Sequence, residues 1–341
     1  MNRMTRALAL TGLLIAGTAT AGHPATTAPH LRDDVVRNGV GDIVFGGGTA
    51  LAYWALDAAG GVASSSYAGN AGPGYTVVAV SDFDGDRSAD VLWTNGSHLK
   101  LWVNNGSGGY TSVSVGNYGG GWVPFAAGDI NGDGKSDLFF RGGTHLAFWL
   151  MNGPVVTSSS YAGDGGAGWR VVAIDRFFYK APSQNGVDVL WTNGSQFKFW
   201  YGYGPESRFA LTQYDFGSYG GGWEPFGAGD VDGNGIADIL FRGGTHIAYW
   251  LMEDNTERFR GGPLYYAHSY YGGDGGAGFR VVAVSDYNND KRTADLLWTN
   301  GSQLKIWVNG SPGADRDAYT PLTIGPYGNG WQPLDLLIPT N

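Results

Sequence analysis

Three loops along the chain place oxygen-bearing side chains at the spacing that a hard cation requires. Each loop has Asp or Asn at positions 1, 3, 5 and 9, and the backbone carbonyl at position 7 can add a further ligand. Such a set of carboxylate, amide and carbonyl oxygens suits Ca²⁺. In chain order, the residues at positions 1, 3, 5, 7 and 9 are Asp82, Asp84, Asp86, Ser88 and Asp90, then Asp129, Asn131, Asp133, Lys135 and Asp137, then Asp230, Asp232, Asn234, Ile236 and Asp238. The sequence therefore predicts three calcium sites.

Three further stretches follow the same plan less completely. A fourth candidate site contains Asp286, Asn288, Asp290 and Asp295, in which the closing acid comes one residue late. The other two stretches are degenerate, and they contain Asp34, Asn38 and Asp42 near the N-terminus, and Asp175 and Asp188 with Arg176 and aromatic residues between them. The sequence leaves open whether these two bind metal.

The acidic loops have an alternative explanation, because Asp, Asn and Gly are also good turn formers. Three copies in register favour the cation, since clustered carboxylates repel one another unless a cation lies among them. Each loop is filled by its own hairpin and leaves little room for substrate. We therefore expect structural calcium, and we expect its removal to lower the melting temperature.

The loops belong to a repeat of roughly 50 residues that exists in two alternating versions. One version occurs at Asp42–Trp54, Asp137–Met151 and Asp238–Met252. The other occurs at Asp90–Trp102, Asp188–Trp200 and Asp295–Trp307. Connectors rich in Tyr and Gly separate the units, and their Gly residues are typical of turns. Six units thus fill residues 34–341 as a single domain.

Within one unit the pattern predicts four short strands bounded by Gly, Asn or Asp. In the third unit these are Trp122–Ala127, Ser136–Phe140, Thr144–Leu150 and Val156–Tyr161. Four antiparallel strands per unit is the size of one propeller blade, and helical periodicity is missing. The fold class predicted is all-β, a six-bladed β-propeller of four-stranded antiparallel blades.

The two ends of the chain predict how the ring closes. The first unit begins near Asp34 with its second strand, whereas the chain ends with a spare first strand at Trp331–Leu337. Placed in the first blade, the C-terminal strand would complete that blade and leave no open edge.

Candidate ligand residues come from the third strand of each unit, where alternate side chains share one face. That face carries a polar residue, a Lys or Ala, and a Trp. Aromatic faces stack on sugar rings while polar groups bond hydroxyls, although blade packing alone would also explain the Trp series. The ligand-binding residues proposed from this pattern, with two turn arginines, are His98, Lys100, Trp102, Arg141, His145, Trp149, Lys198, Trp200, Arg242, His246, Trp250, Lys305 and Trp307. Gln196 and Gln303 take the polar position in the remaining units, and one groove per pair of units would give three sites.

The segment Asp129–Leu138, followed by Trp149–Gly153, resembles the FG-GAP or VCBS repeat family. It is similar to the calcium-bearing blades of integrin α-subunit propellers and of some propeller lectins. The resemblance extends over residues 34–341 and implies the propeller fold and Ca²⁺. Relatives include adhesion receptors, lectins and a few polysaccharide lyases, so it implies no single activity.

The N-terminal residues predict that the chain is exported. Residues 1–21 contain Arg3 and Arg6, an apolar run and Ala19-Thr20-Ala21, which is typical of a signal peptide that precedes a tail at 22–33. Its removal would take the formal charge from −9 to −11, which makes nucleic acid a poor partner. The apolar run is too short to span a membrane. Cysteine is absent, so no disulfide can stabilise the exported protein.

These observations favour a secreted, periplasmic or extracellular, calcium-stabilised module that binds carbohydrate at repeated sites. A lyase acting on polysaccharides through His145 or His246, or a module that adheres to cell-surface protein, remains the alternative. No catalytic residues are assigned, because the histidines obey the repeat and no nucleophile elbow, zinc-binding helix or phosphate loop is present in the sequence.

Overall fold

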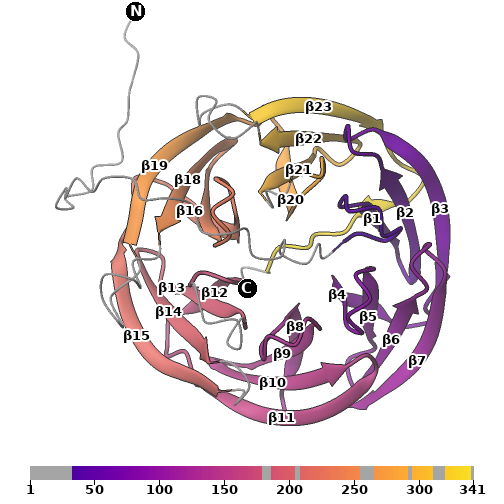
Figure 1. Ribbon diagram of the computed structural model, residues 1–341, viewed down its shortest axis with the longest axis horizontal. Helices are drawn as coiled ribbons and strands as arrows, with labels where there is room; N and C mark the ends of the chain where they lie inside the picture. Colours follow the sequence, from indigo (N-terminus) through magenta and orange to yellow (C-terminus); the bar gives the residue numbers. More distant parts are fainter. Residues whose placement is uncertain are drawn as a thin grey trace, which may run out of the picture.

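The computed structural model describes residues 33–178, 186–203, 208–253, 265–290, 294–309 and 319–338. In these residues twenty-four strands form six four-stranded antiparallel sheets, which stand as blades around a central axis (Figure 1). The prediction of a six-bladed all-β propeller is confirmed. No helix in the described ranges is long and apolar enough to cross a membrane. The predicted signal peptide, and the tail up to residue 32, lie outside the described residues.

The first three blades occupy the N-terminal half of the chain. Blade 1 contains β24 (Gln332–Pro333), β1 (Ile43–Gly47), β2 (Ala50–Leu56) and β3 (Val62–Asn70). Blade 2 contains β4 (Thr76–Ser81), β5 (Asp90–Thr94), β6 (His98–Asn104) and β7 (Tyr110–Asn117). Blade 3 contains β8 (Val123–Gly128), β9 (Asp137–Gly142), β10 (His145–Asn152) and β11 (Val155–Asp164).

The last three blades repeat this order. Blade 4 contains β12 (Arg170–Asp175), β13 (Asp188–Thr192), β14 (Gln196–Tyr203) and β15 (Arg208–Ser218). Blade 5 contains β16 (Glu224–Gly229), β17 (Asp238–Gly243), β18 (His246–Glu253) and β19 (Tyr265–Asp274). Blade 6 contains β20 (Arg280–Ser285), β21 (Asp295–Thr299), β22 (Gln303–Asn309) and β23 (Tyr319–Pro326).

Burial along the strands follows their distance from the axis. The second strand of a blade, such as β5 with sequence DVLWT, is buried over its length because neighbouring blades cover both of its faces. The outermost strand, such as β3 with sequence VASSSYAGN, is mostly exposed and polar. The apolar core therefore lies between blades, and side chains on blade faces determine how neighbouring blades meet.

The C-terminal strand closes the ring as predicted, but it is shorter than the sequence suggests. β24 pairs with β1 through Phe45 with Pro333 and Gly46 with Gln332. The expected strand to Leu337 is wrong beyond Pro333, because only one further bond to β1 follows, from Leu334 N to Val44 O at 2.8 Å, and Leu336 N then donates to Val282 O of blade 6 at 2.8 Å. The chain leaves the blade at this point and runs to the centre of the ring (Figure 1).

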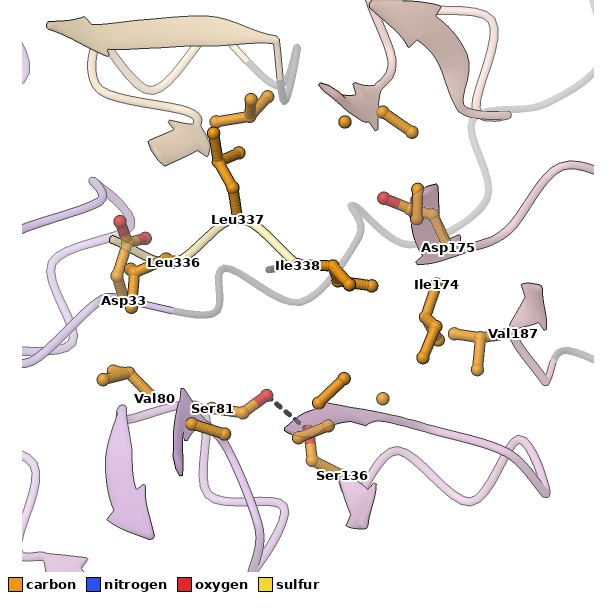
Figure 2. Close-up of a pocket in the computed structure, with 18 of the residues that line it drawn as sticks. Asp33, Val80, Ser81, Ser136, Ile174, Asp175, Val187, Leu336, Leu337 and Ile338 are labelled. Atoms are coloured by element: carbon orange, nitrogen blue, oxygen red, sulfur yellow. Dashed lines mark hydrogen bonds between the residues drawn. The ribbon is translucent and has the colours of Figure 1, made fainter. Parts of the chain in front are cut away.

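The C-terminal segment Leu334–Ile338 fills part of the central channel. A cavity of about 330 Å³ remains beside it, walled by the innermost strands (Figure 2). Leu336 packs with the core between blades 6 and 1, Leu337 with that between blades 5 and 6, and Ile338 with that between blades 3 and 4. The segment thus connects distant blades through apolar contacts.

Candidate functional site

Neighbouring blades meet in two alternating ways, and the first is a sealed interface. It joins blades 1 and 2, 3 and 4, and 5 and 6. A Trp of the second strand packs on a Trp of the third strand, with ring centroids 4.9 Å apart for Trp93 and Trp102, 4.6 Å for Trp191 and Trp200, and 4.7 Å for Trp298 and Trp307. All six rings are buried. These interfaces have no room for a ligand over the indoles.

A lysine spans each sealed interface. The ammonium groups of Lys100, Lys198 and Lys305 donate to the backbone oxygens of Ala71, Gly165 and Gly275 in the preceding connectors. Each ammonium also lies over an aromatic ring, 3.7 Å from the centroid of Tyr75, 4.1 Å from Trp169 and 4.0 Å from Phe279. Lys198 is only 5% exposed. These three lysines, with Trp102, Trp200 and Trp307, therefore lie in inter-blade packing.

His98 lies at the edge of a sealed interface and is already engaged. Its Nδ1 is 3.0 Å from the hydroxyl of Tyr75, and its Nε2 is 2.9 Å from Ser114 Oγ. The sequence pattern groups His98 with His145 and His246, but the structure places it in the other type of interface.

The second type of interface contains a groove. The first groove lies between blades 6 and 1 and has a volume of about 620 Å³. Phe45, Ala52, Trp54 and Tyr67 of blade 1 form one wall, and Tyr327 of blade 6 faces them. Trp331 stands at the rim with its ring 6.3 Å from that of Tyr67, which is 63% exposed. Hydroxyls of Ser65, Ser66 and the tyrosines, and the amide of Asn329, supply polar atoms.

The corresponding position between blades 2 and 3, called the second groove below, repeats the aromatic contacts of the first. Phe140 and Trp149 lie 4.8 Å apart, as Phe45 and Trp54 do, and Trp122 lies 6.4 Å from Tyr161. Here a histidine joins the group, because His145 Nδ1 is 2.7 Å from the hydroxyl of Tyr161 and 4.0 Å from Asp164 Oδ1. The pKa of Asp164 is lowered by a hydrogen bond from Thr144 and by the nearby His145.

The third groove position, between blades 4 and 5, contains the corresponding residues in a closed arrangement. His246 Nδ1 is 2.7 Å from the hydroxyl of Tyr271, as in the second groove. Trp250, however, is only 1% exposed, because Phe197, Phe216 and Phe241 surround it.

The two turn arginines proposed as ligand residues have protein partners. Arg242 pairs with Glu224 at 3.1 Å, and Glu224 also accepts from Arg170 of blade 4 at 3.2 Å. The guanidinium of Arg141 lies 5.8 Å from the ring centroid of Phe125. Neither arginine contacts the aromatic pair of a groove in the contacts described.

Two of the predicted calcium loops bring three carboxylates together. One oxygen from each of Asp82, Asp84 and Asp86 lies within 4.8 Å of the others, and the same holds for Asp230, Asp232 and Asp238. Backbone amides shape the loops, since Asp82 accepts from Gly85 N at 2.7 Å and from Arg87 N at 2.8 Å. Oxygens gathered at this distance fit Ca²⁺.

The loop at Asp129–Asp137 has the same backbone arrangement with an amide in place of one carboxylate. Asp129 accepts from Gly132 N at 2.7 Å and from Gly134 N at 2.8 Å, and Asn131 Oδ1 accepts from Asp133 N at 3.1 Å. Position 3 is therefore neutral in this loop. Its oxygen set fits the same cation, with one carboxylate fewer than the loop at Asp82–Asp90.

The acids at position 9 of the loops, which we predict as calcium ligands, also accept hydrogen bonds from the backbone. Asp90 accepts from Phe83 N at 2.9 Å and from Asn104 N at 2.8 Å, which ties the loop to the third strand. Burial, together with nearby acids and against the effect of these hydrogen bonds, raises the pKa of Asp90 and Asp137 to about 7. Without a cation, ionising these groups is costly.

The remaining loops diverge in different ways. Asp34 and Asp42 accept the same backbone bonds as the complete loops, but position 3 is Val36, which offers no side-chain oxygen. In the fourth blade Asp175 pairs with Asp188, as Ser81 pairs with Asp90, so Arg176 takes the position of the first acid. Its guanidinium donates to Gly235 O of the next loop at 3.0 Å, so the positive charge at this position belongs to the arginine side chain.

The loop of the sixth blade is described only in part. Asn288 N donates to Asp286 at 3.2 Å, Asp290 N donates to Asn288 at 3.0 Å, and Asp295 accepts from Tyr287 N at 2.9 Å. Residues 291–293, which connect these groups to the closing acid, lie outside the described residues.

Backbone hydrogen bonds connect successive loops around the ring. The carbonyl of Asp82 accepts from Ser136 N at 2.7 Å, and the carbonyl of Asp129 accepts from Val187 N at 2.7 Å. The same bond runs from Ala89 N to Asp34 O and from Ala237 N to Arg176 O, each at 2.8 Å. The first residue of one loop therefore positions the residue next to the closing acid of the following loop.

Sequence reasoning identified Trp149 and His145 but missed most of the groove residues. Tyr67 and Tyr161, with Trp331 and Trp122, lie where connectors meet strands, and the sequence pattern assigned them to turns or strand ends and to no ligand site. Their recurrence as Ser-Tyr-Ala-Gly and Tyr-Gly-Gly-Gly-Trp or Tyr-Gly-Asn-Gly-Trp was the available signal, because turns do not require large aromatic side chains.

Comparison with known proteins supports the repeat and the fold. Residues 82–140, which hold two of the acidic loops, match the model of the FG-GAP-like repeat. The comparison with curated protein sequences finds no match. For this stretch, the FG-GAP or VCBS resemblance seen in the sequence is confirmed.

Two solved structures superpose on the chain with a TM-score above 0.5. A lectin from Agrocybe aegerita, described as recognising non-reducing terminal N-acetylglucosamine, superposes with a TM-score of 0.55 at 16% identity over 85% of this chain and 78% of the lectin. The Photorhabdus luminescens Tc holotoxin pore gives a TM-score of 0.51 at 14% identity, over 80% of this chain and 13% of that chain. At these identities the likeness concerns the fold.

Proposed function

We propose that this six-bladed propeller with FG-GAP-like repeat sequence is a calcium-stabilised binding module that recognises carbohydrate in grooves between its blades. The observation that carries the proposal is the first groove. Its volume of about 620 Å³ and its lining of aromatic rings interspersed with hydroxyls and an amide suit a saccharide of one or two rings.

The chemistry of the groove matches the two sides of a sugar. The apolar face of a pyranose stacks on an aromatic ring, and Tyr67 and Trp331 present exposed aromatic surface at the rim. Sugar hydroxyls need partners with both donor and acceptor capacity, which Ser66 and Asn329 supply. The similarity of the fold to a lectin is consistent with this use.

Calcium in this proposal is structural. The loops at Asp82–Asp90, Asp129–Asp137 and Asp230–Asp238 would each hold one Ca²⁺, and the loop ending at Asp295 would hold a fourth. The cation would neutralise carboxylates and fix the loops, whose backbone hydrogen bonds connect successive blades. We further propose that the chain is exported by the signal sequence in residues 1–21.

A glycan array probed with the calcium-saturated full chain tests the binding function. We expect binding to a set of neutral terminal sugars and weaker binding in the Tyr67→Ala and Trp331→Ala variants, which leave the second groove intact. Asp57→Asn, in an exposed turn outside the first groove, should bind as the wild type does. An array with no signal above background would overturn the proposal. A time course with the same glycans, followed by ultraviolet absorbance of unsaturated products, separates binding from lyase activity.

A further inference from the structure

The three groove positions are built from corresponding residues, but two side chains are larger at the third position. The first of them lies three residues before the tyrosine that lines each groove, and it is Val115 in blade 2, Phe216 in blade 4 and Ile324 in blade 6. Val115 and Ile324 are partly buried at the edges of the second and first grooves. Phe216 is buried at the third position. The extra volume of its ring has to occupy space that is open elsewhere.

Phe216 covers the tryptophan of the third groove. Its ring centroid lies 6.3 Å from that of Trp250, and Trp250 is 1% exposed. Ala248, two residues earlier on the same face, is 3% exposed. The corresponding residues of the other two grooves, Trp54 with Ala52 and Trp149 with Ala147, are only partly buried.

A second aromatic residue strengthens the closure. Phe197 stands where blades 2 and 6 have Leu99 and Leu304. It stacks on Tyr219 at 4.6 Å with an interplanar angle of 27°, and it lies 5.7 Å from Trp250. The third groove is thus filled by side chains of its own blades.

The two open grooves differ in charge. No charged side chain lines the first groove among the described residues. Ala50 stands where the second groove has His145. The second groove carries the His145–Tyr161 pair with Asp164 beside it. An anionic sugar would lose its hydration in the first groove and gain no cationic partner.

We propose that the propeller has two ligand sites and one site closed by Phe216, and that the first groove takes an uncharged saccharide. This inference rests on the proposed carbohydrate function. It replaces the expectation of three equal sites with an asymmetric module, in which one of three repeated grooves has become part of the core.

Calorimetric titration of the calcium-saturated full chain with a neutral sugar identified on the array measures the number of sites. The wild-type chain should bind about two equivalents. Phe216→Val, which installs the residue of blade 2, should raise this number to about three. The reciprocal variants Val115→Phe and Ile324→Phe should each lower it to about one. Three sites in the wild type, or no change in Phe216→Val, would overturn the inference.

Hydroxyl-radical footprinting gives a readout that needs no sugar. Trp250 should be protected in the wild type and become oxidised in Phe216→Val, while Trp149 should be oxidised in both. Phe216→Ile, which matches blade 6, serves as a second variant if the valine variant does not fold. If no sugar binds but Trp250 becomes accessible, the proposed function fails while the closed groove stands. If Trp250 is oxidised in the wild type, the closure itself is wrong.

Discussion

Asp33 and Ser285 lie 252 residues apart and join the beginning of the described chain to blade 6. Ser285 Oγ donates to Asp33 Oδ1 at 2.5 Å, and Tyr287 adds a bond at 3.3 Å. Asp33 is buried, and this burial, together with the nearby Asp42 and against the effect of both hydrogen bonds, raises its pKa to about 7. The ring is therefore held near its closure by a carboxyl group that prefers to be protonated.

The substitution Asp33→Asn should remove the loss of folding free energy that ionisation of this buried carboxyl causes at high pH. The folded pKa is above the unfolded value of 3.8, so the folded state binds the proton more tightly, and stability from this group is lost as the pH rises through about 7. Asn keeps an acceptor for Ser285 and cannot ionise. We expect the variant to gain up to about 4 kcal/mol relative to wild type at pH 8, and little at pH 4.

Urea unfolding of both proteins at saturating calcium, at several pH values, measures this difference. Saturating calcium keeps the loop acids in one state, so that the difference between the two proteins reports Asp33. A constant difference between variant and wild type across the pH range would show that Asp33 is not the titrating group.

Calcium affinity should fall as the solution becomes more acidic. In the absence of metal, burial raises the pKa of Asp90, Asp137 and Asp230 to about 7, and a protonated carboxyl cannot ligate. Binding must then release a proton below this value. We expect each site to weaken by up to about tenfold per pH unit below pH 7 and to change little above it. Calorimetry in two buffers of different ionisation enthalpy would count the released protons, and none released at pH 6 would contradict the expectation.

Removing one loop ligand should remove one calcium ion without unfolding the blade. Asp84→Ala takes away the carboxylate at position 3 and the 3.1 Å bond that it accepts from Asp86 N, while Asp82 and Asp90 keep their backbone bonds. At calcium about 100-fold above the dissociation constant, the variant should lose about 2.7 kcal/mol of calcium stabilisation, and in chelator it should lose only the contribution of that bond, about 1 kcal/mol. Asp57→Asn, in an exposed turn, serves as the control. Equal loss in chelator would mean that Asp84 stabilises the loop without metal.

The propeller itself was predictable because each blade repeats a local pattern. Strand length, turn residues and the spare C-terminal strand can all be recognised in the sequence, and the blade order follows from them. The end of the closing strand was not predictable, since Leu334–Ile338 has the apolar composition of a strand yet packs into the channel, where five blades present apolar side chains. A contact with so many distant elements leaves no local signature.

The site was predictable only in part, for the same reason. Trp149 and Trp250 lie in nearly identical sequence contexts, and their different exposure is set by Val115 and Phe216 of the preceding blade. Likewise the sequence pattern predicts Lys198 as a ligand residue, but in the fold its ammonium contacts Trp169 and the backbone oxygen of Gly165. Repeats reveal which residues correspond, but the neighbouring blade decides whether a residue is open to solvent.

Gly165 tests the sealed interfaces most directly. A Cβ at this position would lie 2.3 Å from the ring of Trp191, and one at Gly275 would lie 2.2 Å from Trp298. The packing at these two interfaces therefore leaves no room for a methyl group, whereas the first sealed interface has Ala71 at the corresponding position. Gly165→Ala should destabilise the chain by about 1–3 kcal/mol, since a ring packed against Trp200 cannot move aside freely. Gly119→Ala, where nothing lies within 4 Å of the new Cβ, is the matched control. Thermal unfolding of the two variants makes the comparison, and equal stability would mean that blades 3 and 4 separate more easily than their tryptophan packing implies.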